Sequence, residues 1–258
     1  VGQGEGAVLD LEGRSLEVAV EPCEEVVLEN EWVNLGWKFK RLKIVHAKFL
    51  GTGGVFVPHG RETRGKAVLE HVAMTGDASV WVTFHEGGLV LRNVTCRSTC
   101  QIASTGSDRN VKLEISGCRF LNTEEPGVIK GGLRLHHIKE ARVTNTQIGG
   151  ISASFTGGVK LTLEGCRFDG GFYLRQEQKG RIGKTKISRC DFTSEKIVFE
   201  GPRGGREKVT LKECHFKGDF TATPDEIVRY RIKAEGVKVV VKSPRPAPLE
   251  PADPGKPK

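Results

Sequence analysis

Short segments that alternate apolar and polar residues recur along most of this chain, and glycine-rich stretches separate them. Alternation with a period of two predicts β-strands, and no stretch shows the 3.6-residue periodicity of an amphipathic helix. We therefore expect strands throughout and few helices. Four segments share the template Φ-x-Φ-x-x-C-x-F, where Φ is apolar except for Thr185 in the third: "VKLEISGCRF" (111–120), "VKLTLEGCRF" (159–168), "GKTKISRCDF" (183–192) and "EKVTLKECHF" (207–216).

Weaker copies of the template extend the repeat toward the N-terminus and fill its gaps, at 41–49, 67–74, 89–96 and 141–148. The position equivalent to the template cysteine is then residue 47, 72, 94, 118, 146, 166, 190 and 214, with spacings of 20 to 28 residues. A further apolar segment follows each copy, at 55–57, 80–84, 101–103, 133–135, 151–155, 172–174, 197–199 and 220–222. The template itself contains two short segments, one on each side of its turn, and the further apolar segment is the third. Each repeat thus contains three short strands.

Three short strands in a repeat of 20–28 residues predict one coil of a parallel β-helix, in an all-β solenoid of about eight to nine coils. Successive coils would stack at about 4.8 Å, the spacing between neighbouring strands. A leucine-rich repeat has a similar period, but its L-x-x-L-x-L-x-x-N skeleton is missing.

Two of the weaker copies resemble a known family. "LVLRNVTC" (89–96) and "GLRLHHIKEARVTNTQI" (132–148) are similar to the Φ-x-Φ-x-N-x-x-Φ repeat of right-handed parallel β-helices in the pectate-lyase-like superfamily. Asn93 and Asn145 match the turn asparagine of that family. The resemblance covers about residues 40–223 and implies a right-handed, single-stranded solenoid, but it implies no particular activity. At the turn position the other coils carry His46, His71, Gly117, Gly165, Arg189 and Glu213.

The flanking segments suggest four regions. Residues 1–37 are expected to form an N-terminal cap and a degenerate first coil, and residues 38–223 the β-helix itself. Residues 224–242 predict capping strands that would close the solenoid as a hairpin. Residues 243–258 contain six prolines and almost no apolar side chains, which predicts a disordered tail.

The template cysteine and phenylalanine are two residues apart, so they share one face of the strand. Alanine, valine, isoleucine and methionine replace them in other repeats, which identifies that face as the interior. A free cysteine packs as a small apolar residue, and we expect this of Cys118, Cys166, Cys190 and Cys214. Disulfides between stacked coils are the alternative, since Cα atoms at strand spacing are within reach. Unpaired thiols would favour a reducing compartment. The sequence gives no other indication of where the protein is located.

No constellation in the sequence indicates catalysis, a metal or a cofactor. The CxxxC of Cys96 and Cys100 has no partner pair, and His46 and His71 alone make a poor metal site. General acid–base chemistry needs two positioned groups, and no paired carboxylates are found. A carbohydrate-active enzyme with a non-standard site remains an alternative. Its site would lie beside the long insertion 121–131 and would use Arg134, His136 and His137.

The net charge of +8 favours an acidic partner. Six residues before the template cysteine, on the outer face, the repeats carry a row of basic residues that only Gly88 and Glu140 interrupt: Arg41, Lys66, Lys112, Lys160, Lys184 and Lys208. The loops before this row add further cations, among them Arg181, Arg203 and Arg206. Lysines that merely keep a solenoid soluble are the alternative explanation. Exposed aromatic residues between the cations are expected to be lacking, with Tyr173 nearly alone, so a nucleic acid would be held by its backbone.

The sequence therefore predicts a non-catalytic binding or scaffold module whose basic edge engages an anionic glycan, an acidic protein or a nucleic-acid backbone. A carbohydrate-active enzyme and a structural spacer within a larger protein are the two alternatives. No apolar run approaches the length needed to span a membrane, and the oligomeric state is left open.

Overall fold

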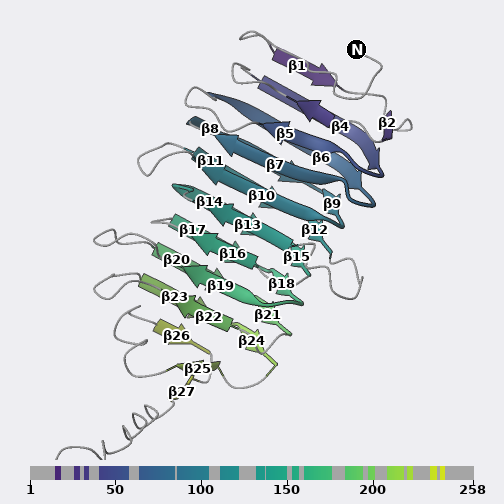
Figure 1. Cartoon of the computed structure of the whole chain (residues 1–258). Coiled ribbons are helices and arrows are strands. Elements are labelled where there is room, and N and C mark those ends of the chain that lie inside the picture. Colours follow the sequence, from purple (N-terminus) through teal and green to yellow (C-terminus); the bar gives the residue numbers. More distant parts are fainter. Residues whose placement is uncertain are drawn as a thin grey trace, which may run out of the picture.

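The structure is a computed structural model of the whole chain (Figure 1). It describes residues 15–18, 26–29, 32–34, 41–57, 64–84, 86–104, 111–121, 132–136, 138–149, 153–156, 160–175, 184–193, 197–200, 208–217, 220–222, 233–236 and 239–241. Strands are the regular structure of these residues, which contain no helix, and every strand pair is parallel.

The strands form a 17-stranded sheet, an 8-stranded sheet and a 2-stranded sheet. The largest, here called the bent sheet, contains β1 (Ser15–Val18), β2 (Val26–Glu29), β4 (Arg41–Leu50), β6 (Arg64–Met74), β8 (Glu86–Arg92), β9 (Thr95–Cys96), β11 (Val111–Ser116), β12 (Arg119–Phe120), β14 (Glu140–Thr144), β15 (Gln147–Ile148), β17 (Lys160–Glu164), β18 (Arg167–Phe168), β20 (Lys184–Ser188), β21 (Asp191–Phe192), β23 (Lys208–Lys212), β24 (His215–Phe216) and β26 (Lys233–Glu235). The 8-stranded sheet, here called the facing sheet, contains β3 (Trp32–Asn34), β5 (Gly54–Val57), β7 (Ser79–Phe84), β10 (Thr99–Ser104), β13 (Gly132–His136), β16 (Ala153–Thr156), β19 (Phe172–Arg175) and β22 (Ile197–Glu200). The smallest sheet pairs β25 (Phe220–Ala222) with β27 (Val239–Val241).

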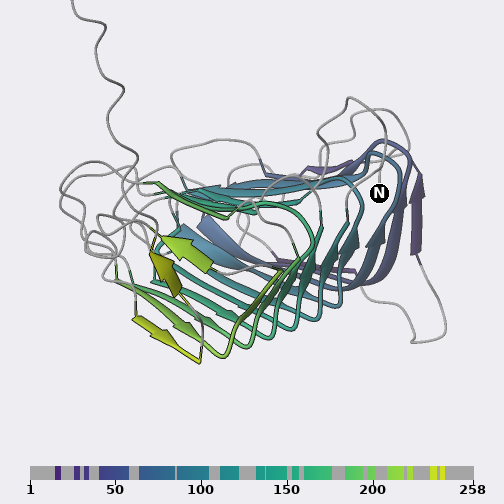
Figure 2. The ribbon, with the colours of Figure 1, turned by 90° about the horizontal axis from the view of Figure 1, so that it is seen from below.

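Each strand pairs with the equivalent strands of the repeats before and after it. Thus β11 pairs with β8 and β14, and β10 pairs with β7 and β13. Figure 2 shows the bent and facing sheets on opposite sides of a common interior. The predicted all-β parallel solenoid is confirmed.

The solenoid differs from the prediction in several details. The structure shows about five turns rather than eight to nine coils. That prediction counted every repeat as a closed coil, whereas several of the connecting segments lie outside the described residues. In the first two of the eight repeats β4 and β6 run without a break through the predicted turn, so the first two of the three predicted strands are one.

The flanking regions are described only in part. β1 and β2 pair with β4, and β3 pairs with β5, so residues of the predicted N-terminal region belong to the two sheets. The two strands predicted to close the far end do not form a hairpin: β26 pairs with β23 and β27 with β25, both in parallel. The proline-rich segment 243–258 lies outside the described residues.

The bend in the bent sheet is made by a row of residues in the left-handed backbone conformation. Their φ angles lie between 48° and 66°. In most coils the backbone N–H of this residue donates to the next coil, as in Asn145 N–H to Glu164 O at 2.9 Å and Gly165 N–H to Ser188 O at 3.0 Å. These bonds hold a conformation that ordinarily favours glycine or asparagine. The row comprises His46, His71, Asn93, Gly117, Asn145, Gly165, Arg189, Glu213 and Gly236.

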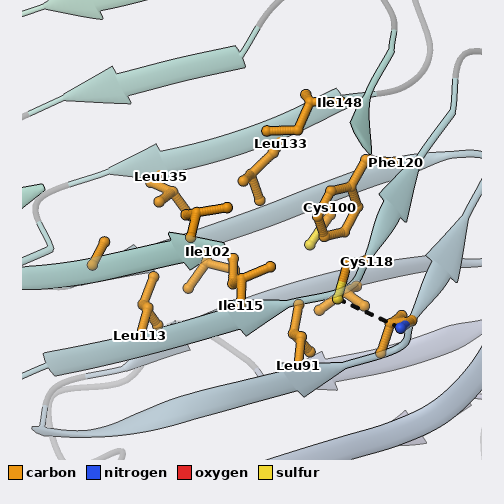
Figure 3. Close-up of a cluster of buried hydrophobic side chains, with 14 of the residues drawn as sticks. Leu91, Cys100, Ile102, Leu113, Ile115, Cys118, Phe120, Leu133, Leu135 and Ile148 are labelled. Atoms are coloured by element: carbon orange, nitrogen blue, oxygen red, sulfur yellow. Dashed lines mark hydrogen bonds between the residues drawn. The ribbon is translucent and has the colours of Figure 1, made fainter. Parts of the chain in front are cut away.

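The interior is a stack of rows, each built from one template position. Three of the four template phenylalanines are a continuous stack, in which the rings of Phe168 and Phe192 lie 4.8 Å apart and nearly parallel, as do those of Phe192 and Phe216. Ile148 separates Phe120 from this stack. Phe172, from the facing sheet, meets Phe168 edge-on at 5.2 Å. Figure 3 shows side chains of both sheets, such as Leu133 and Ile115, packed into one core. The core thus joins the two sheets along the stack.

Candidate binding surfaces

The structure places the six predicted cations in one row, hereafter the basic row. Arg41 lies opposite Lys66, Lys160 opposite Lys184, and Lys184 opposite Lys208, each on neighbouring strands. Gly88 and Glu140 occupy the interruptions, as the sequence predicts. All six basic side chains are exposed. The row is therefore a linear array of cations within the first three residues of the bent-sheet strands.

The charge of the basic row is uneven along its length. Lys160 Nζ lies 2.6 Å from Glu140 Oε1, and this hydrogen bond lowers the pKa of the Glu140 carboxyl below its usual value. By contrast, Lys184 and Lys208 are adjacent to each other, with Lys186 two residues along β20. None of these three lysines forms an ion pair within the described part of the chain. An uncompensated stretch of positive charge in the described part of the row thus lies on β20 and β23.

The remaining predicted residues either lie outside the described residues or belong to the other sheet. Arg181, Arg203, Arg206 and His137 lie outside the described residues. Arg134 and His136 are on β13 of the facing sheet, half-buried, with side chains that alternate with the buried Leu133 and Leu135. The described residues of the alternative carbohydrate-active site are therefore on a different sheet from the basic row.

The outer face of the facing sheet carries a row that the sequence analysis missed. Phe56, Trp81, Gln101 and Arg134 lie opposite one another on β5, β7, β10 and β13. Tyr173 continues the same row two strands further on. Trp81 is 50 % exposed, and the other four side chains are half-buried. Tyr173 therefore shares this outer row with two other aromatic side chains, Phe56 and Trp81, and is not nearly the only aromatic residue on the surface.

The alternation within β7 was the available signal for this row. Val80 and Val82 are buried, so Trp81 between them must point outward. In the sequence 80–84 stands out as an apolar segment, but the repeat template does not set its register against 55–57. Aligning the third strands of successive repeats would have revealed the row.

A polar cluster lies on the outer face of the short strands of the bent sheet. Asp169 accepts hydrogen bonds from Arg167 Nε at 2.6 Å and Gln147 Nε2 at 2.7 Å, and from the Thr193 hydroxyl at 3.3 Å. Partial burial opposes ionisation of Asp169, but these bonds lower its pKa. A carboxylate with three donors is a poor proton acceptor, so we assign the cluster a structural role.

Asp191 and His215 form the other contact of this face. His215 Nδ1 lies 3.0 Å from Asp191 Oδ1, and both side chains are mostly exposed. No group of three or more His, Cys, Asp or Glu within the described ranges is arranged to hold a metal ion. The pair therefore has no further metal-ligating neighbour in this part of the chain.

The cysteines among the described residues are free and buried: Cys96, Cys100, Cys118, Cys166, Cys190 and Cys214. The sequence predicted this for the last four of them. The thiol of Cys118 donates to Ser116 O at 3.3 Å, and its sulfur accepts from the Val94 N–H at 3.5 Å (Figure 3). Thr146 occupies the same row and repeats this pattern, donating to Thr144 O at 2.9 Å and accepting from the Cys118 N–H at 3.4 Å. The row thus accepts a hydroxyl in place of a thiol.

Burial of the thiols should make folding sensitive to alkaline pH. Burial raises the pKa of Cys96 and Cys118 from 9.0 to about 11. Between pH 9 and 11 the unfolded chain then ionises these thiols while the folded chain keeps them protonated. Their stabilisation is full below pH 9 and is lost as the pH rises, by about 2–3 kcal/mol for each thiol.

Urea unfolding of the wild type and Cys118→Thr at pH 8 and at pH 11 measures this loss. We expect similar stability at pH 8, because Thr146 shows that the row accepts threonine. At pH 11 the variant should have lost about 2–3 kcal/mol less than the wild type. Lysine deprotonation affects both proteins equally, so an identical pH dependence would contradict the assignment.

Comparisons with known proteins assign this chain to no family. No family model matches the chain, and no curated protein or solved structure matches it significantly. In the part of the chain that the structure describes, no helix has the length and apolar character needed to cross a bilayer.

Proposed function

We propose that this chain is a non-catalytic binding module whose basic row engages a linear polyanion, such as an anionic glycan, an acidic protein segment or a nucleic-acid backbone. The observation that carries the proposal is the register of Lys160, Lys184 and Lys208, which occupy one row on three consecutive strands. Like charges directly opposite on neighbouring strands are unfavourable. An anion bound along the row would relieve that repulsion.

The solenoid supports such a role because its parallel register sets the cations side by side on neighbouring strands. Cations recur at about 4.8 Å wherever the row is unbroken. A partner with regularly spaced negative charges can therefore contact several lysines at once, and their contributions combine.

We also propose that the coil is right-handed, as in the pectate-lyase-like superfamily. The left-handed turn residues Asn93 and Asn145 support this, together with the strong preference of parallel crossovers for that hand.

The triple variant Lys160→Ala/Lys184→Ala/Lys208→Ala tests the proposal on immobilised heparin and on duplex DNA. Each lysine near an anionic surface contributes on the order of 1 kcal/mol, so affinity at low salt should fall about 100-fold. The salt concentration needed for elution should fall as well, because fewer counterions are released.

Two further variants make the test specific to the row. Lys48→Ala/Arg119→Ala removes cations from other parts of the bent sheet and should retain most of the binding. Glu140→Gln removes the acid that interrupts the row and pairs with Lys160, so it should strengthen binding. Equal retention of the triple variant and the wild type would reject the basic row as the binding surface.

A further inference from the structure

The outer face of the facing sheet carries a group of side chains that the basic row does not use. Trp81, Gln101 and Arg134 lie opposite one another on three consecutive strands, β7, β10 and β13. Strand spacing places the Cα atoms of Trp81 and Arg134 about 9–10 Å apart. An aromatic ring, an amide and a guanidinium therefore face the same side within a short distance.

No described residue is a partner that would explain the position of Arg134. Its side chain is half-buried, yet no hydrogen bond or ion pair joins it to another residue within the described ranges. A guanidinium that has lost part of its hydration without a partner is unfavourable, and its planar fork suits the oxygens of a phosphate or carboxylate. Arg134 is therefore positioned to receive an anion.

Trp81 is the second unusual residue of the group. Among the described residues it is the one large apolar side chain that is exposed, with 50 % of its surface accessible. Phe56 lies beside it on β5, in register with it. Two aromatic side chains on neighbouring strands form an exposed platform, and such patches commonly mark binding sites.

We infer that this face binds single-stranded nucleic acid. A base would stack on Trp81, the Gln101 amide would hydrogen-bond its edge, and Arg134 would bind a backbone phosphate. Stacking of bases on sheet aromatics, combined with cations for the phosphates, is how exposed β-sheets recognise single strands. Phe56 would extend the platform by one base.

The charges of this face favour that occupant over a neutral sugar chain. The described residues of the row are Asn34, Phe56, Trp81, Gln101, Arg134, Ser154, Tyr173 and Val198, and none is a carboxylate. The row thus offers donors and a cation rather than carboxylate acceptors for sugar hydroxyls. Phosphates and base carbonyls supply the matching acceptors, and the net charge of +8 attracts a polyanion.

Fluorescence anisotropy with labelled oligo(dT) and oligo(U), measured over a range of salt concentrations, tests the inference. Trp81→Ala should weaken binding about 5- to 150-fold, the loss typical of one stacked base. Trp81→Phe should retain part of the affinity and shows that the loss is not due to unfolding. Arg134→Ala should reduce the salt slope of binding by about 0.7, the value for one phosphate on a single strand. Arg119→Ala is the charge-matched control and should change little.

The test separates this inference from the function proposed for the basic row. Oligonucleotide binding that is absent, or unchanged in both Trp81→Ala and Arg134→Ala, overturns the inference even if the lysine variant loses heparin. Binding that depends on Trp81 but not on Lys184 and Lys208 supports the inference and shows that the basic row is not the site for single strands. Trp81-dependent binding of uronate oligosaccharides, without binding of either oligonucleotide, overturns the assignment of the ligand.

Discussion

Phe168→Ala is expected to lower the free energy of unfolding by about 3–5 kcal/mol, the range for removing a fully buried phenylalanine. Phe168 is 1 % exposed, its ring stacks on Phe192 at 4.8 Å, and Phe172 of the facing sheet meets it edge-on. The substitution removes contacts to the next coil and to the opposite sheet together. A solenoid coil contacts only its neighbours, so the lost contacts cannot be replaced from elsewhere in the molecule.

Chemical denaturation monitored by circular dichroism measures this effect. Phe216→Ala is the matched control, because Phe216 is the last described ring of the same stack and is only half-buried. We expect the control to lose clearly less stability than Phe168→Ala. Equal losses for the two variants would show that the stack does not contribute as the structure indicates.

Gly165→Ala is expected to destabilise the fold by about 2–4 kcal/mol. Gly165 has a φ of +61°, which costs a residue with a Cβ about 1–2 kcal/mol. A Cβ at this position would also lie 2.6 Å from Asn145 Oδ1 of the preceding coil, closer than side chains allow. The strained backbone and the close contact therefore add.

Two further variants separate these contributions. Gly236→Ala has nearly the same φ, +66°, but among the described residues the nearest atoms to its Cβ would be at 4.0 Å, so it should show only the backbone cost. Adding Asn145→Gly to Gly165→Ala removes the contact and should recover part of the lost stability. A double-mutant cycle with no coupling between residues 145 and 165 would contradict the close approach.

The repeat template alone predicted much of the fold because a solenoid converts sequence period into register. The spacing of Cys166, Cys190 and Cys214 fixes which residues lie opposite one another on neighbouring coils. The basic row follows directly, since Lys160, Lys184 and Lys208 are each six residues before a template position. The turn row follows in the same way, even where His46 or Glu213 replaces asparagine.

Prediction was weaker for the strands whose register the repeat template does not determine. The segments of the facing sheet vary in length and follow loops of different lengths, so Trp81 and Phe56 were not aligned with Arg134. At the C-terminal end, two apolar strands close in sequence suggested a hairpin. Instead β26 continues the parallel stack, because its edge pairing with β23 extends the existing sheet.

The close approach of Asn145 to Gly165 is repeated by Asn93 and Gly117, where a Cβ would lie 2.5 Å from Asn93 Oδ1. An asparagine at one turn thus occupies the space that a side chain at the next turn would need. The two coils of each pair also match in sequence, as "LRNVTC" with "VTNTQI" and "ISGCRF" with "LEGCRF". In this segment asparagine and glycine therefore alternate at the turn over a unit of two coils. Inserting a second asparagine coil would place its Cβ against the asparagine of the preceding turn, whereas copying an asparagine–glycine pair would lengthen the rod without that clash.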